Sequence, residues 1–550
     1  MKKYFFYILS ITVLLSTSAF LITSAEEEKD SKNLSLFSSV FKMLKDQFVD
    51  TLDSDFLIRR AIDGMVKSVD PHTVFFDEKE SAERGKVWQG IQYSGIGARV
   101  TNRDSSVVIT SPLEGYGAQL NDLRAGDVYV KIDSMFVKGL PMDSVIARLR
   151  GNAETAVNVT VDRPYVGIVN KTITRKQIVT PSIAFYTMLD TATGVGYIQV
   201  QQFLSGSDHQ FENAVKELKK NPRLKSIILD LRDNTGGLVE EAVNCVNVFV
   251  PKNTIVIHLH GKATDYNNVT HNEPIDTVMP LVILTNNNTI SAGEIFTGAM
   301  QDLDRAVIIG QKTFGKGLVQ GTRFPGYGTS LYVTAARYYT PSGRCIQKRD
   351  YSKRYINGQE TIFSDTLKKV FYTRNGRKVY DIGGIEPDIK TEPQQGSTPV
   401  IDALNKAYLI FDYATYFRNT KTIKVPANKI EVTDIGFYDF IRFVEKKKYN
   451  FKIAEEDKLK EFEELMKKDN TSHIFSKKYK ALYDQVINSK KDILIENKEA
   501  IKKALQREIV LRYYYNTGMM ENTILSDPEI LKAKEVLNNP KIYSEILNKK

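Results

Sequence analysis

Residues 280–300, "PLVILTNNNTISAGEIFTGAM", decide the fold. The first half is a short apolar run that ends in three asparagines. The second half places Ile295, Phe296 and Ala299 at the spacing of a helix face. We therefore expect a buried strand that leads directly into a helix, with Ser291 at the turn between them.

Two further segments repeat this pattern. The apolar run "SIILDL" (226–231) comes before the helical pattern "LVEEAVNCVNVFV", and "RAVIIG" (305–310) follows the helix that begins near Ser291. Strands that are apolar on both faces and alternate with helices predict a parallel sheet covered by helices. We assign this α/β core to residues 174–395.

The segments around the core differ in composition. Residues 26–89 have helical periodicity, and residues 90–173 contain short β-rich runs that predict a compact β domain. After a Pro/Gln/Gly/Ser stretch, residues 396–550 are rich in Lys and Glu and have a mostly helical pattern. We therefore expect a helical N-terminal region, a β domain, the core and a helical C-terminal extension.

The first 25 residues have the pattern of a secretory signal. Lys2 and Lys3 precede a long apolar run, and small residues lie before a charged stretch. We expect an exported protein of the periplasm or cell envelope. The apolar run, of roughly 20 residues, is also long enough for an uncleaved membrane anchor, so membrane contact through this segment is an alternative.

Charge and cysteine content narrow the class of protein. The net charge is +10, but much of the excess Lys is scattered through residues 396–550 without interleaved aromatic or Arg-rich motifs. This distribution argues against a nucleic-acid partner. The only cysteines are Cys245 and Cys345, and we predict a buried thiol at Cys245 rather than a disulfide.

Ser291 has two possible roles from the residues alone. Serine is favoured as an N-cap, where it binds free backbone donors. Active sites of open α/β sheets also lie at the carboxyl ends of strands, where a helix N-terminus offers N–H groups to an oxyanion. The backbone N–H groups of Gly236 and Gly237, in "LDLRDNTGG", could join that of Ala292 in such a hole, or the glycines could form a simple turn.

Lys316 is a candidate proton acceptor in "TFGKGLVQ". A lysine base must be neutral, and its ordinary pKa is about 10.4. Burial beside Phe314 and Leu318 would lower the pKa of the amine. Gln320 is uncharged and could orient this amine, but residues four apart on a regular strand lie roughly 13 Å apart. Contact would therefore need a bend, which the glycines on either side of Lys316 permit.

Five ordered motifs carry a family resemblance: "LDLRDNTGG", "TISAGEIF", "RAVIIGQKTFGKGLVQ", "YYTPSGRCIQ" and "GGIEPD". Together they resemble the carboxyl-terminal processing, or tail-specific, serine proteases, and the match covers residues 65–395. The resemblance implies a ClpP/crotonase-like core, with Ser291 as nucleophile, Lys316 as general base and Gln320 as its orienting group. It implies no cofactor. Gly293 and Cys345 depart from the usual Ala and Ser of the family.

The β domain resembles a PDZ domain, inserted in or preceding the protease core. "YSGIGARV" (93–100) is similar to a carboxylate-binding loop, and "LRAGDVYVKIDSMFV" is similar to a strand pair of the same fold. The resemblance implies that Gly95, Ile96 and Gly97 bind the free, apolar C-terminus of a protein or peptide substrate, which pairs with the next strand. It also suggests Arg150 as a switch residue.

The residues leave three alternatives open. His258 and His260 share one face of a strand, with His271 farther on, and such imidazoles can bind zinc. We predict no metal, because no acidic partner has metal spacing and H-E-x-x-H is absent. His72 is an alternative base. A non-catalytic tail-binding or assembly protein is the alternative function, and the helical flanks suggest a homo-oligomer or an adaptor.

Overall fold

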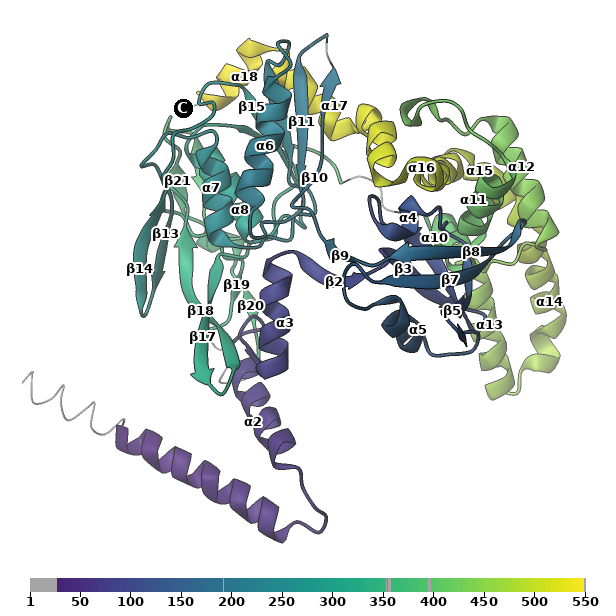
Figure 1. The fold of residues 1–550 in the computed structure, drawn as a ribbon, viewed down its shortest axis with the longest axis horizontal. Coiled ribbons are helices and arrows are strands. Elements are labelled where there is room, and N and C mark those ends of the chain that lie inside the picture. The colour runs from purple at the N-terminus through teal and green to yellow at the C-terminus, as the bar shows by residue number, and fades with distance from the viewer. Residues whose placement is uncertain (1–26, 191, 353, 355–357, 394–396, 549–550) are drawn as a thin grey trace, which may run out of the picture. The chain divides into compact units, whose positions relative to one another are not determined.

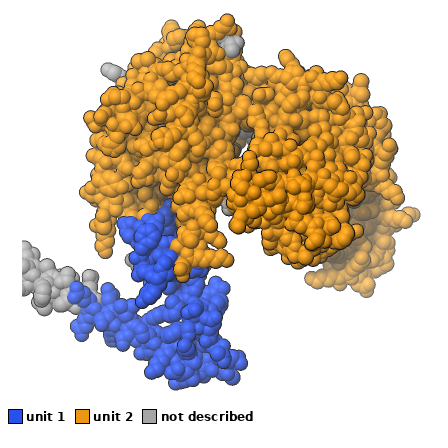
Figure 2. Space-filling model, viewed as in Figure 1, with its two compact units in different colours: residues 1–77, 322–333, 351–359 blue, residues 78–321, 334–350, 360–550 orange. Residues whose placement is uncertain are grey.

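The structure is a computed structural model. It describes residues 27–190, 192–352, 354, 358–393 and 397–548, so the predicted signal segment 1–25 lies outside the described residues. The chain forms two compact units, which Figure 2 shows in different colours. Unit 1 comprises residues 1–77, 322–333 and 351–359, and unit 2 comprises residues 78–321, 334–350 and 360–550. No helix among the described residues is long and apolar enough to span a bilayer.

Unit 1 is mainly helical. Residues 27–47 form a helix, and α2 (Ser54–Val69) begins where the Asp53 carboxylate accepts hydrogen bonds from the first backbone N–H groups. The short strand β1 (Val74–Phe76) pairs with the beginning of β18 (Thr329–Tyr339). Between α2 and β1, the Asp70 carboxylate accepts the N–H of His72, whose ring packs edge-on against Tyr351. His72 therefore belongs to a packed turn.

The core of unit 2 is a six-stranded sheet in the order β10-β11-β12-β15-β16-β23. Only β10 is antiparallel to its neighbour. Every residue of β12 and β15 is buried, as their apolar runs predicted. The strands are β10 (Ile183–Asp190), β11 (Val195–Val200), β12 (Ser226–Asp230), β15 (Leu281–Thr285), β16 (Val307–Gly310) and β23 (Ile389–Lys390).

Helices cover both faces of this sheet. On one face, α6 (Ser207–Lys219), α7 (Val239–Asn247) and α8 (Ala292–Asp302) contribute to one buried apolar cluster with the strands. On the other face, the last two helices, α17 (Pro528–Leu537) and α18 (Pro540–Leu547), supply the cover (Figure 1). Residues 528–547, which belong to the expected C-terminal extension, therefore pack on the core sheet.

The other C-terminal helices form a cluster with its own apolar core. Its longest helix, α16, is broken at Tyr515, where φ is 55° and ψ is −154°. The helices are α10 (Pro399–Lys406), α11 (Leu409–Thr420), α12 (Asp434–Lys446), α13 (Ala454–Lys468), α14 (Ser472–Asn488), α15 (Lys490–Glu496) and α16 (Lys498–Thr523).

The β domain is a twisted sheet in the order β3-β4-β5-β7-β8, with β6 beside β5 and a separate β2–β9 pair. The guanidinium of Arg103 binds the Asp412 carboxylate through both nitrogens, which holds the domain to α11. The elements are β2 (Ile91–Gly95), β3 (Ala98–Arg103), β4 (Ser106–Pro112), α4 (Gly117–Leu120), β5 (Val128–Ile132), β6 (Met135–Phe136), α5 (Met142–Leu149), β7 (Ala156–Arg163), β8 (Gly167–Thr174) and β9 (Lys176–Val179).

Smaller elements complete unit 2. The hairpin of β13 (Ile255–Gly261) and β14 (Thr264–Val269) pairs with the end of β18, which β17 (Leu318–Gly326) also joins. Helix α3 (Glu78–Trp88) precedes the β domain. Two short pairs of strands come between β18 and β23 in the sequence. They are β19 (Arg349–Asp350) with β20 (Thr361–Ile362), and β21 (Val370–Tyr372) with β22 (Lys378–Tyr380).

Arg232, directly after β12, connects the core sheet to α17. Its guanidinium lies 2.6 Å from the carboxylate of Asp230, 2.8 Å from that of Asp527 and 2.7 Å from that of Glu529. Asp527 also caps α17 by accepting the N–H of Glu529. The end of a central strand and the start of the last helix pair therefore share one ion-pair network.

We expect Arg232→Ala to lower the free energy of unfolding by about 3–5 kcal/mol, because Asp230 and Glu529 would keep buried charges without their partner. Urea unfolding of the purified chain measures this change. Arg223→Ala removes an exposed arginine from the same region and should change stability by no more than about 0.5 kcal/mol. Equal losses in the two variants would contradict the role of the network.

Candidate active site

Three loops meet at the carboxyl edge of the core sheet. They follow the neighbouring parallel strands β12, β15 and β16 and comprise residues 231–237, 286–291 and 311–317. Carboxyl ends of adjacent parallel strands lie at one edge, where open α/β sheets carry their sites. Ser291, Lys316, Gly236 and Gly237, which the sequence predicted as site residues, all come from these loops.

Ser291 occupies the N-cap of α8 in an unusual backbone conformation. Its φ is 56° and its ψ is −114°. A residue with a side chain in such a region costs about 1–3 kcal/mol and persists only where its surroundings fix it. The Ser291 carbonyl accepts the N–H groups of Glu294 and Ile295, and the preceding Ile290 N–H donates to the Asn234 carbonyl at 2.9 Å. The turn is therefore held from both sides.

Glu294 connects this turn to the lysine loop. Its side chain is fully buried, which raises the pKa of the carboxyl, while hydrogen bonds to the carboxylate oppose that rise. Oε2 accepts both the Ser291 N–H, at 3.0 Å, and the Lys316 N–H, at 2.9 Å. Oε1 accepts the Gly315 N–H at 2.7 Å and the Thr313 hydroxyl at 2.6 Å. One carboxylate thus fixes the backbone of both predicted catalytic residues.

Glu294 is not among the site residues predicted from the sequence. The sequence does contain a pattern that points to this residue, because Ser291 and Glu294 have the S-x-x-E spacing of a capping box. That pattern predicts a carboxylate that accepts the N–H of the N-cap residue. It does not predict that the same carboxylate also binds a loop more than twenty residues away in sequence.

Lys316 and Gln320 are in contact. The Lys316 Nζ donates to Gln320 Oε1 at 2.9 Å, and the Gln320 Nε2 donates to the Thr334 hydroxyl at 3.2 Å. Lys316 lies in the irregular loop before β17, whereas Gln320 lies within the strand. The bend expected between the two residues is therefore present. Of the two apolar neighbours predicted for Lys316, Leu318 is buried and Phe314 is exposed.

The backbone on either side of Lys316 is also fixed. The Gly315 carbonyl accepts the Lys348 N–H, and the Gly317 N–H donates to the Gln347 side chain at 2.7 Å. A Cβ on Gly317 would lie 2.9 Å from the Gln347 backbone nitrogen, so only glycine permits this approach. Cys345, which also packs against Gly317, has a free thiol.

The two glycines after β12 differ in what they can offer to an oxyanion. The Gly236 N–H donates to Asn234 Oδ1 at 2.9 Å, so another group of the protein already holds it. By contrast, the N–H groups of Gly237 and Ala292 make no hydrogen bond within the described part of the chain. Gly236 instead serves close packing, because a Cβ there would lie 2.9 Å from the Ser291 Cβ.

Comparison with known proteins identifies the family. The chain is 30% identical over 500 residues to a probable CtpA-like serine protease of Staphylococcus aureus (strain COL), and this match covers 88% of the chain and 89% of the relative. The chain belongs to peptidase family S41. The Peptidase family S41 profile itself matches residues 194–356, which contain all the loops described above. This S41 peptidase is therefore a serine protease of the carboxyl-terminal processing group, which acts on protein substrates.

Other matches cover the remainder of this S41 peptidase. The profile of the "Probable PDZ-protease, C-terminal helical domain" matches residues 400–537, and that of the "Activating protease CtpB N-terminal domain" matches residues 9–80. A probable CtpA-like serine protease of Staphylococcus saprophyticus is 30% identical over 78% of the chain and 80% of its own length. A solved photosystem II D1 C-terminal processing protease is 26% identical over 64% of the chain and 86% of its own, with a TM-score of 0.36.

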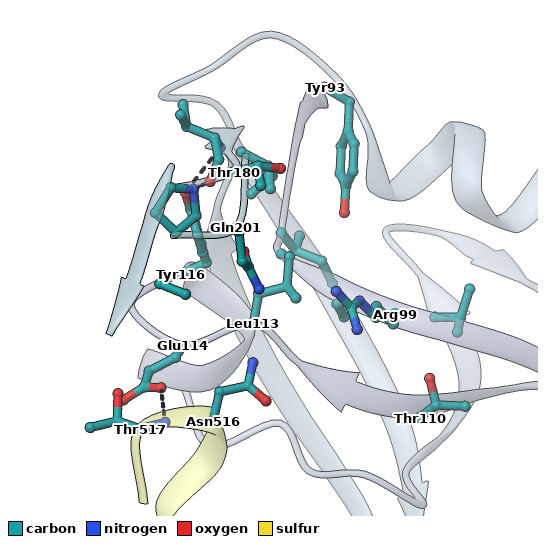
Figure 3. A pocket seen from close by; sticks show the side chains of 18 of the residues that line it. Tyr93, Arg99, Thr110, Leu113, Glu114, Tyr116, Thr180, Gln201, Asn516 and Thr517 are labelled. Carbon is teal, nitrogen blue, oxygen red and sulfur yellow. Dashed lines mark hydrogen bonds between the residues drawn. The ribbon is translucent and has the colours of Figure 1, made fainter. Parts of the chain in front are cut away.

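A groove of about 970 Å³ lies beside the β domain (Figure 3). Ile96 and Gly97 of the predicted carboxylate loop line it, and Gly95 precedes them at the end of β2. Three parts of unit 2 supply its walls. They are the β domain with Ala98, Val100, Leu113, Ile146 and Leu149, the core sheet with Phe185 of β10, Gln199 of β11 and Gln201 just after β11, and α16 with Asn516, Thr517, Met519 and Met520.

Two contacts fix the walls of this groove. The Thr517 N–H, just after the break in α16, donates to the Glu114 carboxylate at 3.1 Å, shown as a dashed line in Figure 3. Across the groove, the guanidinium of Arg150 lies over the Tyr93 ring, 4.6 Å from its centroid. Burial raises the pKa of the Tyr93 hydroxyl. Arg150 therefore lies at the groove, and its role as a switch residue stays a prediction.

We expect Gly236→Ala to lower kcat about 100-fold, because the new methyl group would displace the Ser291 turn and misplacement of about 1 Å has effects of this size. The measurement is the rate of proteolysis at saturating substrate. Gly206→Ala is the matched control, because Gly206 has a similar φ of 82° but open space around its Cβ position. Similar losses in both variants would show that backbone strain, not contact with Ser291, is responsible.

We expect Glu294→Gln to reduce activity strongly and to lower the free energy of unfolding by about 1.5–3 kcal/mol. The amide NH₂ would face N–H donors in place of a charged acceptor. Urea unfolding and turnover, measured together, test this. Gln301→Glu changes another buried residue of the same helix. It is the control for a loss of stability that leaves the contacts of Ser291 and Lys316 unchanged. Full activity of Glu294→Gln would contradict the role of the carboxylate.

Proposed function

We propose that this S41 peptidase cleaves protein substrates with Ser291 as nucleophile, Lys316 as general base and Gln320 as the group that orients the lysine. The observation that carries this proposal is the shared Glu294 oxygen, which accepts the N–H groups of both Ser291 and Lys316. The second support is the 2.9 Å hydrogen bond from Lys316 to Gln320. A neutral acceptor such as an amide can hold the amine while favouring its charged form less than a carboxylate would.

The reaction would follow the acyl-enzyme route. Ser291 Oγ attacks the scissile carbonyl carbon while its proton passes to the neutral Lys316 amine. The N–H groups of Ala292 and Gly237 would stabilise the oxyanion, since neither is engaged within the described residues. Lys316 then returns the proton to the leaving amine as the C–N bond breaks. Water, activated by the same lysine, hydrolyses the ester and releases Ser291. Every group in this route belongs to the protein.

We further propose that the β domain is a PDZ domain that binds the free C-terminus of the substrate. An extended tail would pair with β3, and the turn at Gly95, Ile96 and Gly97 would direct N–H groups at its carboxylate. The groove has apolar side chains from Leu113, Ile146 and Leu149, which suit an apolar last residue. The remaining wall, from the core strands, would lead the chain onward toward the catalytic loops.

The N-terminal segment is part of the same proposal. Export through residues 1–25 would place the enzyme in the periplasm or cell envelope, where a tail-recognising protease meets other exported proteins. A homo-oligomer or an adaptor that docks on the helical flanks stays a prediction.

The test is intact-mass analysis of a poorly folded reporter with an apolar C-terminal tail, incubated with the full chain in EDTA. We expect internal cleavage by wild type and no cleavage by Ser291→Ala. Lys316→Ala should lose a factor of about 10²–10⁴, the usual contribution of a general base. Lys312→Ala is the matched control in the same loop and should retain activity. A reporter that ends in two aspartates should be cleaved more slowly.

The outcomes separate the two candidate functions. Ser291→Ala that binds the apolar tail without cleaving it, beside an active wild type, supports the dyad and the groove together. Cleavage by Ser291→Ala at the wild-type rate would overturn the assignment of the nucleophile. Tail binding with no cleavage by wild type would favour a tail-binding protein over an active protease.

A further inference from the structure

The hairpin of β13 and β14, labelled in Figure 1, carries a cluster of side chains that the proteolytic mechanism does not use. His258 and His260 are two residues apart on β13 and therefore share a face. Their rings are stacked, with centroids 6.3 Å apart and planes 18° from parallel. The pairing register places His258 opposite Asn267 and His260 opposite Asp265 on β14.

Asp265 lies between the two imidazoles. Its Oδ1 is 3.1 Å from His258 Nε2 and 3.5 Å from His260 Nδ1. One ligand atom from each of the three residues lies within 4.8 Å of the others. In a tetrahedral zinc site with bonds of about 2.0–2.1 Å, ligand atoms are about 3.3 Å apart. Two of the three separations are therefore already close to those of a zinc site.

The prediction of no metal rests on the sequence, in which no carboxylate has metal-ligand spacing relative to the histidines. Strand pairing supplies that carboxylate, since the tight turn at Gly261–Thr264 brings Asp265 directly opposite His260. His271, the third histidine considered, is not part of the cluster.

Asn267 prepares His258 to bind a metal ion. The Asn267 Oδ1 lies 2.8 Å from His258 Nδ1, and an amide oxygen can only accept a hydrogen bond. With an ion bound between His258 and Asp265, Asn267 Oδ1 would accept the Nδ1–H of His258, which leaves the Nε2 lone pair for the metal. Nε2 is the atom that faces Asp265. Metal-binding histidines usually have this arrangement, in which an outer partner holds the other ring nitrogen.

We propose that His258, His260 and Asp265 bind a Zn²⁺ ion, with a fourth position open to water. Two imidazoles and one carboxylate are ligands that zinc accepts, whereas Mg²⁺ and Ca²⁺ prefer oxygen ligands alone. The side chains are 41%, 61% and 65% exposed, so an ion reaches them from solvent. Because both strands are already paired, binding requires only small side-chain rotations.

Because of the position of the hairpin, a bound ion would stabilise the structure near the loop that carries Lys316. β13 pairs with β18, where His258 is opposite Tyr339 and His260 is opposite Arg337. Between these two positions, the Tyr338 N–H donates to the Gly317 carbonyl at 3.0 Å, next to Lys316. Zinc would therefore join β13 to β14 beside the strand that supports the lysine loop. We expect it to raise the thermal stability of the chain.

The test uses the full chain, freed of metal by a chelator that is then removed by dialysis. Isothermal titration with ZnCl₂ should show one ion per chain, and Zn²⁺ should raise Tm. Co²⁺ should give the visible absorption of a four-coordinate site. Asp265→Asn and His260→Ala should each abolish this binding. Asn267→Ala, which removes only the outer partner, should weaken it about 10- to 100-fold. His209→Ala, at an exposed histidine elsewhere, should leave it unchanged.

Several results would overturn the proposal. These are the absence of saturable Zn²⁺ binding by the wild type, unchanged binding by Asp265→Asn, or equal loss of binding in His209→Ala. Circular dichroism confirms that each variant is folded, so that loss of binding reports on the ligands. All three ligands lie outside the proposed catalytic groups, so failure of this test leaves the protease assignment intact, and failure of the Ser291 test leaves this site intact.

Discussion

The buried carboxylate of Glu294 is the interaction on which the proposed active site depends. A carboxylate without access to water is costly unless donors surround it, and here three backbone N–H groups and one hydroxyl do so. Those donors come from the Ser291 turn and from the loop that carries Lys316. The cost of burying the charge therefore becomes a constraint on geometry, since the two loops can satisfy Glu294 only when both are in place.

The strained turn at Ser291 is possible because of this constraint. Asn234 adds a second link, since its carbonyl accepts the Ile290 N–H while its side chain holds the Gly236 N–H. Gly293 allows that side chain to come close, because a Cβ at this position would lie 2.9 Å from Asn234 Oδ1. The glycine that departs from the family pattern is thus consistent with tight packing around Ser291.

The C-terminal region has two structural roles. Helices α10–α12 and α14–α16 contribute to a separate apolar core, and Asp412 of α11 holds the β domain through Arg103, whereas α17 and α18 cover the second face of the core sheet. A parallel sheet needs cover on both faces. The segment between these roles includes the broken part of α16, which lines the groove of the β domain. One wall of the groove and the cover on the second face of the core sheet are therefore supplied by one continuous stretch of chain.

The sequence by itself determined the buried parallel strands, the strand-to-helix turn at Ser291 and the membership of a protease family, because these depend on local apolar patterns and on short ordered motifs. It also suggested that Lys316 and Gln320 meet, because the glycines on either side of Lys316 permit a bend before the strand. Only the tertiary structure showed the four donors around Glu294, the return of α17 and α18 to the core, the engagement of the Gly236 N–H and the placement of Asp265 between two histidines. Each of these features joins segments that are far apart in sequence. Strand pairing and burial decide which of these segments meet, and their separation in sequence does not predict it.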